Sequence, residues 1–462
     1  MAAFGKKKKA SEFPDVIPVS EAIRKGDIFT KLTCLIMGAG NLARKQIIQG
    51  LLFLTGELAY ILYMVFYGAK ALQNFVTLGT ETQKKVFNEA TQVYEYATGD
   101  NSQLCLLYGV VTFFVTIGFI LLWRAAIRSS YIAQKAQEAG KKPITFGQIL
   151  KDLKDNRMYQ LFLLFPFLGI ILFTVMPLVF MILMAFTNYD RDHLPPGKLF
   201  DWVGFQNFAR VLNAGGALGE TFWRVLGWTI IWAIFATFLN YIFGIILAII
   251  INREGTKFKA FWRFIFVLTI AVPQFVSLLV VNTMIQQHGV INLLLKELFG
   301  VGPLPFLTNV TWARVTVIVI NLWVGIPYTL LAVTGILKNI PAELYEAARV
   351  DGANAFVTFF KITMPYMMFV MTPNLITTFT GNINNFNVIY LLTQDVFVTN
   401  NQQLAQSNAK EIDLLVTWLF RLTQEYYNYK MAAVLGIMVF IVCAVFTVVC
   451  FHFINKKEAT FS

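Results

Sequence analysis

Charge is scarce in this sequence. Of its 462 residues, 14% are Asp, Glu, Lys or Arg, whereas soluble globular proteins carry about 25%. Apolar residues make up 57% of the chain, above the usual share of about 45–50%. A protein with so few charges and so many apolar residues cannot present an ordinary water-exposed surface, so the composition argues against a soluble protein.

Side chains that hold metals or perform catalysis are also rare. The three histidines (His193, His288 and His452) are isolated and belong to no H-E-x-x-H motif, and the four cysteines form no C-x-x-C pair. A phosphate-binding G-x-x-x-x-G-K-[ST] loop is absent from the sequence. These absences argue against a membrane-embedded enzyme and assign any ATP chemistry to another protein. We expect no catalytic residues, no cofactor and no metal site.

Long uncharged runs are abundant. A hydrocarbon core about 30 Å thick requires about 20 helical residues. Segments that meet this length without a charge, or with Glu57 alone in the first of them, are 46–69, 101–123, 158–189, 225–252, 264–295, 315–337, 362–394 and 431–455. The sequence therefore predicts an all-α, polytopic membrane protein with eight transmembrane helices.

The basic residues indicate the orientation of these spans. Net charge is +12, and most Lys and Arg residues lie before the first span and in the loops that alternate to the same side. By the positive-inside rule both termini are predicted to be cytoplasmic, in the cytoplasmic membrane. The run Lys6–Lys9 is interpreted as a solvated arm near anionic membrane lipids, and we expect no nucleic acid as a partner.

The spans and the charges together divide the chain into five parts. The predicted parts are a cytoplasmic tail (1–45) with an amphipathic piece at 19–36, two accessory transmembrane helices (46–126), a basic and helical cytoplasmic segment (127–157), a six-helix core (158–455) and a cytoplasmic tail (456–462). The segment 70–103 is predicted to be a polar outer loop. Glu57 lies within the membrane, and we expect it to be a packed structural residue with a bonding partner.

The cytoplasmic loop at 338–365 has a recognisable local pattern. Asn339–Val350 predicts a short helix that begins near Pro341, where the missing N–H of proline costs nothing. Gly352 supplies the left-handed stop. Asn354 can cap a second short helix that leads to Pro365 at the start of the seventh span. The loop therefore predicts two short helices joined by a glycine turn, with a small surface at Ala347 and Ala348.

Polar residues interrupt the sixth and seventh spans. The seventh span contains Asn382, Asn384, Asn385 and Asn387, and the sixth contains the run Asn321–Tyr328 with Gly325 and Pro327. Buried amides need hydrogen-bond partners, so these residues must face protein or a polar cavity. Interrupted helices with polar residues near mid-depth are typical of a translocation site. The alternative is that the amides bond neighbouring helices to each other.

The cytoplasmic loop resembles a known signature. Glu346-Ala347-Ala348 is followed after three residues by Gly352, after nine more by Ile362, and then, after one residue, by Met364-Pro365. This spacing resembles the EAA motif of permease subunits of binding-protein-dependent ABC importers, in which Leu replaces Met364. The resemblance implies the ABC importer permease fold, and residues Glu346, Ala347, Ala348, Gly352, Ile362 and Pro365 would contact an ATP-binding subunit.

Further motifs narrow the resemblance to the carbohydrate branch and its larger maltose/maltodextrin-type permease subunit. They are V-G-F-x-N-F at 203–208, G-x-x-N at 289–292, G-x-P-Y at 325–328 and N-N-F at 384–386 followed by L-L-T. Spans 1 and 2 are similar to the two extra N-terminal helices of that subunit. Two departures bear on which sugar is bound: Gly381 stands where the best-known member of the family has an aromatic ring, and Gln394-Asp395-Val396 replaces the usual Gly-Gly-Pro.

The resemblance also implies a substrate site and partners. The substrate-binding residues carried over by position are Val324, Gly325, Tyr328, Thr378, Asn382 and Asn385. Asn amides can bond sugar hydroxyls and Tyr can stack on a sugar face. The expected partners are a second permease subunit, two ATP-binding subunits and an extracellular solute-binding protein. The expected substrate is maltose or maltodextrin, with galacto-oligosaccharides as an alternative, and an ion-coupled secondary transporter as a further one.

Overall fold

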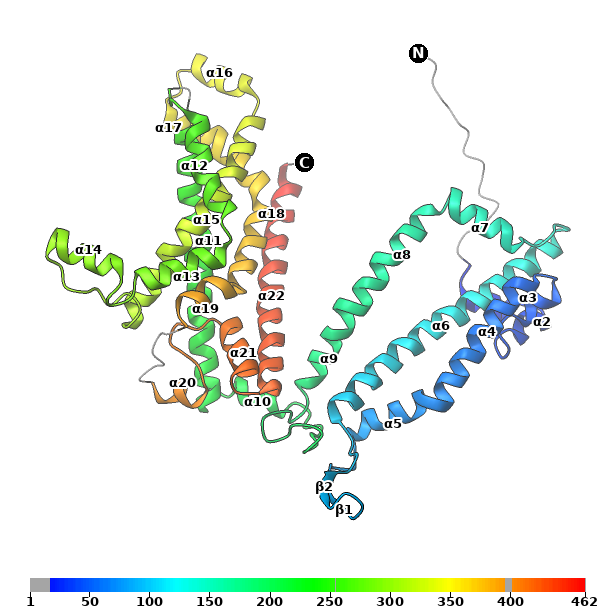
Figure 1. Ribbon diagram of the computed structural model, residues 1–462. Helices are drawn as coiled ribbons and strands as arrows, with labels where there is room; N and C mark the ends of the chain where they lie inside the picture. The colour runs from blue at the N-terminus through cyan, green and yellow to red at the C-terminus, as the bar shows by residue number, and fades with distance from the viewer. Residues whose placement is uncertain (1–16, 254, 395–400, 462) are drawn as a thin grey trace. The chain divides into compact units, whose positions relative to one another are not determined.

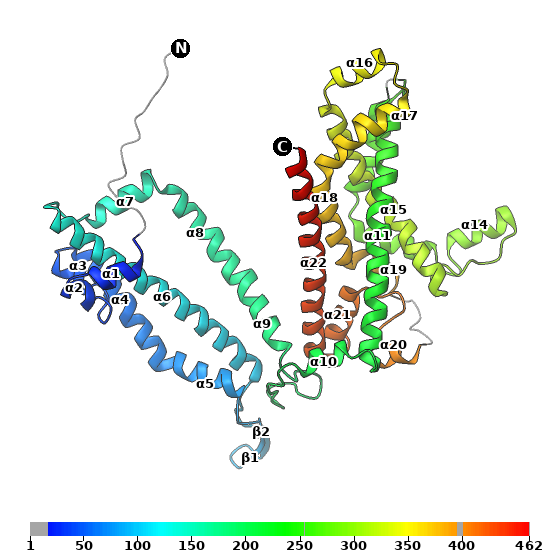
Figure 2. The ribbon, with the colours of Figure 1, turned by 180° about the vertical axis from the view of Figure 1, so that it is seen from behind.

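The computed structural model describes residues 17–253, 255–394 and 401–461, which divide into two compact units (Figures 1 and 2). Unit 1 comprises the chain up to Leu183 and the loop Thr187–Trp202. Unit 2 comprises Met184–Phe186 and the chain from Val203 onward. The predicted basic arm at Lys6–Lys9 and the residues Asp395 and Val396 lie outside the described residues.

Both units are built from long apolar helices. Among the described residues, seven helical segments are long and apolar enough to cross a membrane, and an eighth candidate consists of two helices bent by 90°. The seven segments are Ile47–Thr77, Ser102–Glu138, Met158–Met184, Ala217–Asn252, Val310–Asn339, Ala355–Leu392 and Tyr429–His452, and the bent pair is Lys259–Ala271 with Gln274–Met284. The predicted all-α fold with eight transmembrane helices is confirmed.

Unit 1 contains short N-terminal helices, the first three spans and a β-hairpin. Its elements are α1 (Val19–Lys25), α2 (Ile28–Leu32), α3 (Ala39–Ala43), α4 (Ile47–Tyr63), the π-helical turn η1 (Met64–Gly68), α5 (Ala69–Thr77), β1 (Lys85–Asn88), β2 (Val93–Tyr96), α6 (Ser102–Glu138), α7 (Phe146–Asp155), α8 (Met158–Ile170), η2 (Ile171–Val175) and α9 (Met176–Met184). The second span therefore continues as one helix well beyond the charged boundary at Arg124.

Glu57, the only acidic residue of the first span, has a bonding partner. Its Oε2 accepts a hydrogen bond of 2.7 Å from the backbone N–H of Met37, and the Met37 side chain is fully buried. Met37 lies in the turn between α2 and α3, where the backbone N–H has no helical carbonyl to bond. The contact agrees with the predicted structural role of Glu57.

Replacement of Glu57 should therefore depend on whether the acceptor oxygen is kept. Glu57→Leu leaves the buried N–H of Met37 unpaired, and we expect the free energy of unfolding to fall by about 1–3 kcal/mol. Glu57→Gln keeps an acceptor and should be close to wild type. Thermal unfolding of the two purified variants in the same detergent measures this difference, and equal midpoints would show that the bond contributes nothing.

The loop between the first two spans contains a hairpin that the sequence did not predict. β1 pairs antiparallel with β2, with Lys85 opposite Tyr96. At the base of the loop, Asp100 Oδ2 accepts the backbone N–H groups of Thr80 and Glu81, and these bonds hold the pKa of the Asp100 carboxyl below its usual range. The segment predicted to be only a polar loop is thus an ordered structure anchored next to α6.

Unit 2 contains the remaining spans and the loop that carries the EAA-like motif. Its elements are α10 (Gln206–Leu212), α11 (Ala217–Asn252), α12 (Lys259–Ala271), α13 (Gln274–Met284), α14 (Val290–Phe299), α15 (Val310–Asn339), α16 (Ala342–Val350), α17 (Ala355–Thr358), η3 (Phe359–Thr363), α18 (Met364–Ile383), α19 (Phe386–Leu392), α20 (Gln402–Gln406), α21 (Leu415–Gln424) and α22 (Tyr429–Phe461). Figures 1 and 2 place α16 and α17 at one end of unit 2 and α10, α20 and α21 at the opposite end.

Helix α11 is the centre of unit 2, where it packs against α12, α15, α18, α20 and α21. Buried side chains form two clusters along it. One, near the α20 end, includes Trp228, Trp232 and Leu278. The other, near the α16 end, includes Leu330 and Met367. These clusters fix α11, α15 and α18 against one another. Five of the six predicted substrate residues lie on α15 and α18, and the sixth, Asn385, is the N-cap of α19.

Three of the prolines in the spans are accommodated in two different ways. Pro177 and Pro365 each follow a π-helical turn by two residues, at η2 and η3. A widened turn relieves the clash between the proline ring and the preceding carbonyl. At Pro273 the helix instead ends: Val272 leaves the helical region with ψ of 128°, and α13 starts at Gln274 in a direction 90° away from α12. The fifth predicted span is therefore broken.

Candidate functional site

The loop between the sixth and seventh spans has the predicted helix, turn and helix. Gly352 has a φ of +72°, in the left-handed region that favours glycine. The N–H of Gly352 donates to the carbonyl of Arg349, and the N–H of Ala353 donates to that of Ala348. Together these bonds form a Schellman motif, which ends α16 and sets its angle to α17. Pro341 occupies the N-cap position, and α16 begins at Ala342.

The predicted coupling residues of α16 lie mostly at the surface. Glu346, Ala347 and Gly352 are exposed, whereas Ala348 is buried. The Tyr345 hydroxyl lies 3.1 Å from Thr363 Oγ1, so α16 is tied to η3. The exposed small residues and the fixed turn give this end of unit 2 a defined surface.

Large apolar side chains continue that surface on both short helices. Leu344 and Val350 on α16 and Phe356 on α17 are exposed, as is Phe360 in η3. Of the other two predicted coupling residues, Ile362 is half-buried in η3, and Pro365 is exposed in the first turn of α18. Exposed apolar groups beside a rigid turn are typical of a protein-binding surface.

Asn382 and Asn385 are bonded to each other and to neighbouring helices. Asn382 Nδ2 donates to Thr237 Oγ1 of α11 at 2.9 Å, and Asn385 Nδ2 donates to Asn382 Oδ1 at 3.3 Å. Asn385 Oδ1 accepts the backbone N–H of Val388 and so caps α19. In this arrangement the two amides join α11, α18 and α19. The atoms that make these hydrogen bonds can bind a ligand only after the bond to the neighbouring helix has opened.

Gly325 and Thr378 contact the adjacent turn of α11. A Cβ on Gly325 would lie 2.2 Å from Asn240 Nδ2, so the close approach of α15 to α11 requires glycine. The Thr378 hydroxyl lies 3.5 Å from that of Tyr241, which also accepts a bond from Asn374 Nδ2 at 2.9 Å. Three predicted residues, Gly325, Thr378 and Asn382, therefore contact one short stretch of α11. We call this stretch the polar strip; it consists of Thr237, Asn240 and Tyr241.

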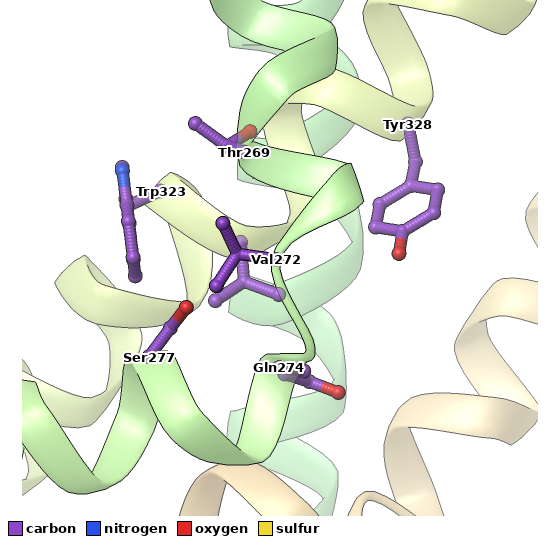
Figure 3. Close-up of a pocket in the computed structure, with 7 residues that line it drawn as sticks. Thr269, Val272, Gln274, Ser277, Trp323 and Tyr328 are labelled. Carbon is purple, nitrogen blue, oxygen red and sulfur yellow. The ribbon is translucent and has the colours of Figure 1, made fainter.

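Val324 and Tyr328 lie at a different place, around the break at Pro273. There a small recess, open to solvent, is lined by Thr269, Val272, Gln274, Ser277, Trp323, Val324 and Tyr328. Figure 3 shows the rings of Trp323 and Tyr328 on either side of the bent chain. The lining has two aromatic rings, hydroxyls and one amide, and no charged side chain. Such a surface can stack on an apolar face and bond neutral hydroxyl groups.

Sequence inspection missed most of this recess and all of the polar strip. Thr269, Gln274 and Ser277 belong to the fifth span, and Asn240 and Tyr241 to the fourth. A signal was present, because polar residues stand in otherwise uncharged apolar runs, and Gln274 and Ser277 lie one and four residues after Pro273.

Comparison with known proteins supports the ABC importer permease fold. Residues 240–457 match the family described as binding-protein-dependent transport system inner membrane component. The chain is 35% identical over 421 residues to the galactooligosaccharides transport system permease protein GanP of Bacillus subtilis, which covers 88% of this chain and 93% of that protein. It is 33% identical over 430 residues to the maltodextrin transport system permease protein MalC of Streptococcus pneumoniae. This alignment covers 91% of this chain and 94% of that protein.

Two further similarities are more limited. Identity to the maltose/maltodextrin transport system permease protein MalF of Escherichia coli is 34% over 267 residues, which covers 57% of this chain and 51% of that protein. A solved bacterial ABC transporter involved in import of the acidic polysaccharide alginate superposes with a TM-score of 0.55 at 22% identity, covering 67% of this chain and 99% of that one. The latter shows the fold alone.

These observations define the class of protein as a multi-pass permease of an ABC importer. The chain belongs to the family of binding-protein-dependent transport system inner membrane components. It is a transport subunit, and its resemblance to the larger maltose/maltodextrin-type permease subunit is confirmed.

Proposed function

We propose that this chain is the membrane-spanning subunit of an ATP-driven importer for a neutral oligosaccharide, with maltodextrin as the first candidate. The observation that carries the proposal is the uncharged recess with two aromatic rings beside Pro273. An anionic sugar would favour a compensating positive charge at the site, since an unpaired buried charge is costly. Neither the recess nor the polar strip has one.

Galacto-oligosaccharides are the second candidate. The similarity to GanP of Bacillus subtilis is as extensive as the similarity to MalC of Streptococcus pneumoniae. Gly381, which has open space around its Cα, removes an aromatic platform expected in a maltodextrin site. We therefore propose Val324 and Tyr328 as direct sugar contacts, and Gly325, Thr378, Asn382 and Asn385 as residues that shape the translocation path beside the polar strip.

The proposed complex contains four further polypeptides. They are a second permease subunit, two ATP-binding subunits and an extracellular solute-binding protein. The surface around Glu346, Ala347 and Val350 supports docking of an ATP-binding subunit, because it combines a rigid Schellman turn with exposed apolar side chains. ATP-dependent uptake that survives an ionophore would exclude the ion-coupled alternative.

The proposed topology places both termini in the cytoplasm, with residues 158–455 as the core and 46–126 as accessory helices. Within unit 2, the end of α22 and the helix α16 lie at the same end in both views (Figures 1 and 2). This is the arrangement expected if the C-terminus and the coupling surface face the same compartment.

Uptake by the intact importer should depend on the aromatic rings of the recess. If Trp323 covers one face of a sugar ring, Trp323→Ala removes about 1.5–3 kcal/mol of apolar contact, which corresponds to a loss in uptake efficiency of about tenfold or more. We expect this loss for labelled maltotriose in membrane vesicles supplied with ATP, measured per assembled complex. A labelled galacto-oligosaccharide in parallel identifies the preferred sugar.

Trp262→Ala is the matched control. Trp262 on α12 is 45% exposed and Trp323 is 46% exposed, but Trp262 does not line the recess. The proposal predicts normal uptake for Trp262→Ala. Equal uptake by both variants would show that the recess is not part of the sugar path. Preferred uptake of an acidic oligosaccharide would show that the substrate is not a neutral sugar.

A further inference from the structure

Residues 27–44 of unit 1 form a folded segment whose amphipathic order is inverted. Thr30 and Thr33 are fully buried, whereas Ile28 is 80% exposed and Leu35 is 78% exposed. The exposed apolar stripe consists of Ile28, Phe29, Leu32, Leu35 and Ile36. A helical segment that faces water buries its apolar side and exposes its polar side. The opposite order is expected where the surroundings are apolar.

The polar face of this segment is bonded to α6. Arg44, whose side chain is buried, donates to both carboxylate oxygens of Asp27 at 2.6 Å and to Ser130 Oγ at 3.0 Å. Gln134 Oε1 accepts from the backbone N–H of Asp27 and from Thr30 Oγ1, both at 2.9 Å. Charged and polar groups that turn inward and pair with one another are typical of protein within a membrane.

The turn between α2 and α3 also has backbone groups that bond to side chains. Trp123 Nε1 donates to the carbonyl of Cys34 at 3.0 Å, and Glu57 accepts the N–H of Met37. Glu57 lies ten residues after Ile47, about 15 Å along the helix. Irregular backbone within a bilayer persists only where protein groups take up its hydrogen bonds, as they do here.

Exposed basic residues neighbour the apolar stripe along the chain and at Arg124, next to the Trp123 that bonds Cys34. The basic rim consists of Arg24, Lys31, Lys45 and Arg124, all of which are exposed. The neighbouring acids are already paired, Glu21 with Lys25 and Asp27 with Arg44. A basic side chain near an anionic leaflet contributes about 1 kcal/mol to membrane binding. The charge around the stripe is therefore complementary to anionic lipid headgroups.

We propose that residues 28–36 are a re-entrant membrane anchor, embedded in the leaflet on the side where α4 begins. The apolar stripe contacts acyl chains, and the basic rim contacts anionic headgroups. The partner of this surface is the lipid bilayer itself. Arg44, Asp27 and Glu57 act as positioning residues that hold the anchor against α4 and α6.

The anchor can be tested by the depth of a spin label. The full chain, purified with the subunits that accompany it, is reconstituted in nanodiscs of phosphatidylcholine and phosphatidylglycerol after replacement of its four cysteines by serine. Nitroxides are placed by Leu35→Cys, by Val65→Cys in the first span and by Lys142→Cys in the loop before α7. The ratio of collision rates with oxygen and with a water-soluble nickel chelate reports depth.

The ratio at Leu35 should approach that at Val65 and exceed that at Lys142 by about fivefold or more, because an interfacial element lies about 5–10 Å within the boundary. A ratio at Leu35 equal to that at Lys142 would place the stripe in water and overturn the anchor. Poor collision with both reagents would show that protein covers the stripe, and would equally overturn a lipid contact.

The headgroup contact has a separate readout. Wild-type protein should unfold at a higher temperature in nanodiscs with phosphatidylglycerol than in nanodiscs of phosphatidylcholine alone. The double variant Lys31→Gln, Arg124→Gln should lose most of this difference, whereas Lys141→Gln, Lys142→Gln should keep it. An unfolding temperature that is the same in both lipids for the wild type would overturn the assignment of anionic headgroups to the basic rim.

Discussion

Gly352→Val should uncouple ATP hydrolysis from sugar uptake. The glycine has a φ of +72°, and a Cβ there would meet no heavy atom within 4 Å. The penalty is therefore backbone strain and not a clash, and it amounts to about 1–2 kcal/mol or more for a β-branched residue. That energy lowers the equilibrium ratio of formed to opened turn between α16 and α17 by about 5- to 30-fold. Without this turn the two short helices lose their fixed angle.

Uptake and ATP hydrolysis measured on the same vesicles test this prediction. Uptake should fall about in proportion to the turn population, while hydrolysis continues and binding of sugar to the solute-binding protein is unchanged. Gly352→Asn is the matched control, because asparagine tolerates the left-handed conformation, and it should keep most of the coupling. If Gly352→Val kept the wild-type rate of ATP-coupled uptake, the turn would not be needed for coupling.

The helices of this protein were predictable because a bilayer demands long apolar runs, but their bends were not. Pro166, Pro177, Pro327 and Pro373 lie within helical spans that continue through them, whereas Pro273 ends α12 and turns the chain by 90°. The ring and the missing N–H are the same at every proline. What differs is whether neighbouring helices and a widened turn can take up the freed carbonyl, and that depends on tertiary contacts absent from the sequence.

The loop of α16 and α17 was predicted within one or two residues, because its signals are local. A proline at the N-cap, a glycine in the left-handed region and a capping Asn354 act over a few positions. The polar interior of the spans could be predicted only in part. Asn382 was singled out correctly as a residue that must have partners, but the identity of its partner, Thr237, depends on how α18 packs against α11.

Arg421→Met should cause a large loss of stability, because it removes the ion-pair partner of the buried Asp413 carboxylate. Asp413 and Arg421 lie 3.2 Å apart with side chains 1% and 8% exposed. Asp413 also accepts the backbone N–H of Lys410 at 2.7 Å, and the Lys410 ammonium donates to the carbonyls of Thr393 and Gln394 at the end of α19. Removing one partner of a buried pair costs about 3–5 kcal/mol.

This loss should reach the candidate site through α19. The helix is capped by Asn385 at its start and bound by the Lys410 ammonium just beyond its end. Core residues on it pack against Trp228, whose indole N–H donates to the carbonyl of Ile412 at 3.1 Å. We therefore expect Arg421→Met to lower both the unfolding temperature and the yield of assembled complex.

The effect of Arg421→Met should also depend on pH. Burial already raises the pKa of the Asp413 carboxyl, and Arg421 opposes that rise. Without the arginine the pKa in the folded protein increases further above the unfolded value of about 3.9. A group with a raised folded pKa binds more protons in the folded state, so it contributes more stability as the pH falls. The loss caused by Arg421→Met should therefore be smaller at about pH 5 than at about pH 8.

Arg224→Met provides the comparison that isolates burial. Arg224 and Glu220 are also 3.2 Å apart, but their side chains are 51% and 35% exposed. An exposed pair contributes about 1 kcal/mol or less, so Arg224→Met should change the unfolding temperature little at either pH. Addition of Asp413→Asn to Arg421→Met removes the unpaired charge and should recover part of the loss. Equal destabilisation by Arg224→Met and Arg421→Met would mean that burial of the Asp413 carboxylate is not what makes Arg421 necessary.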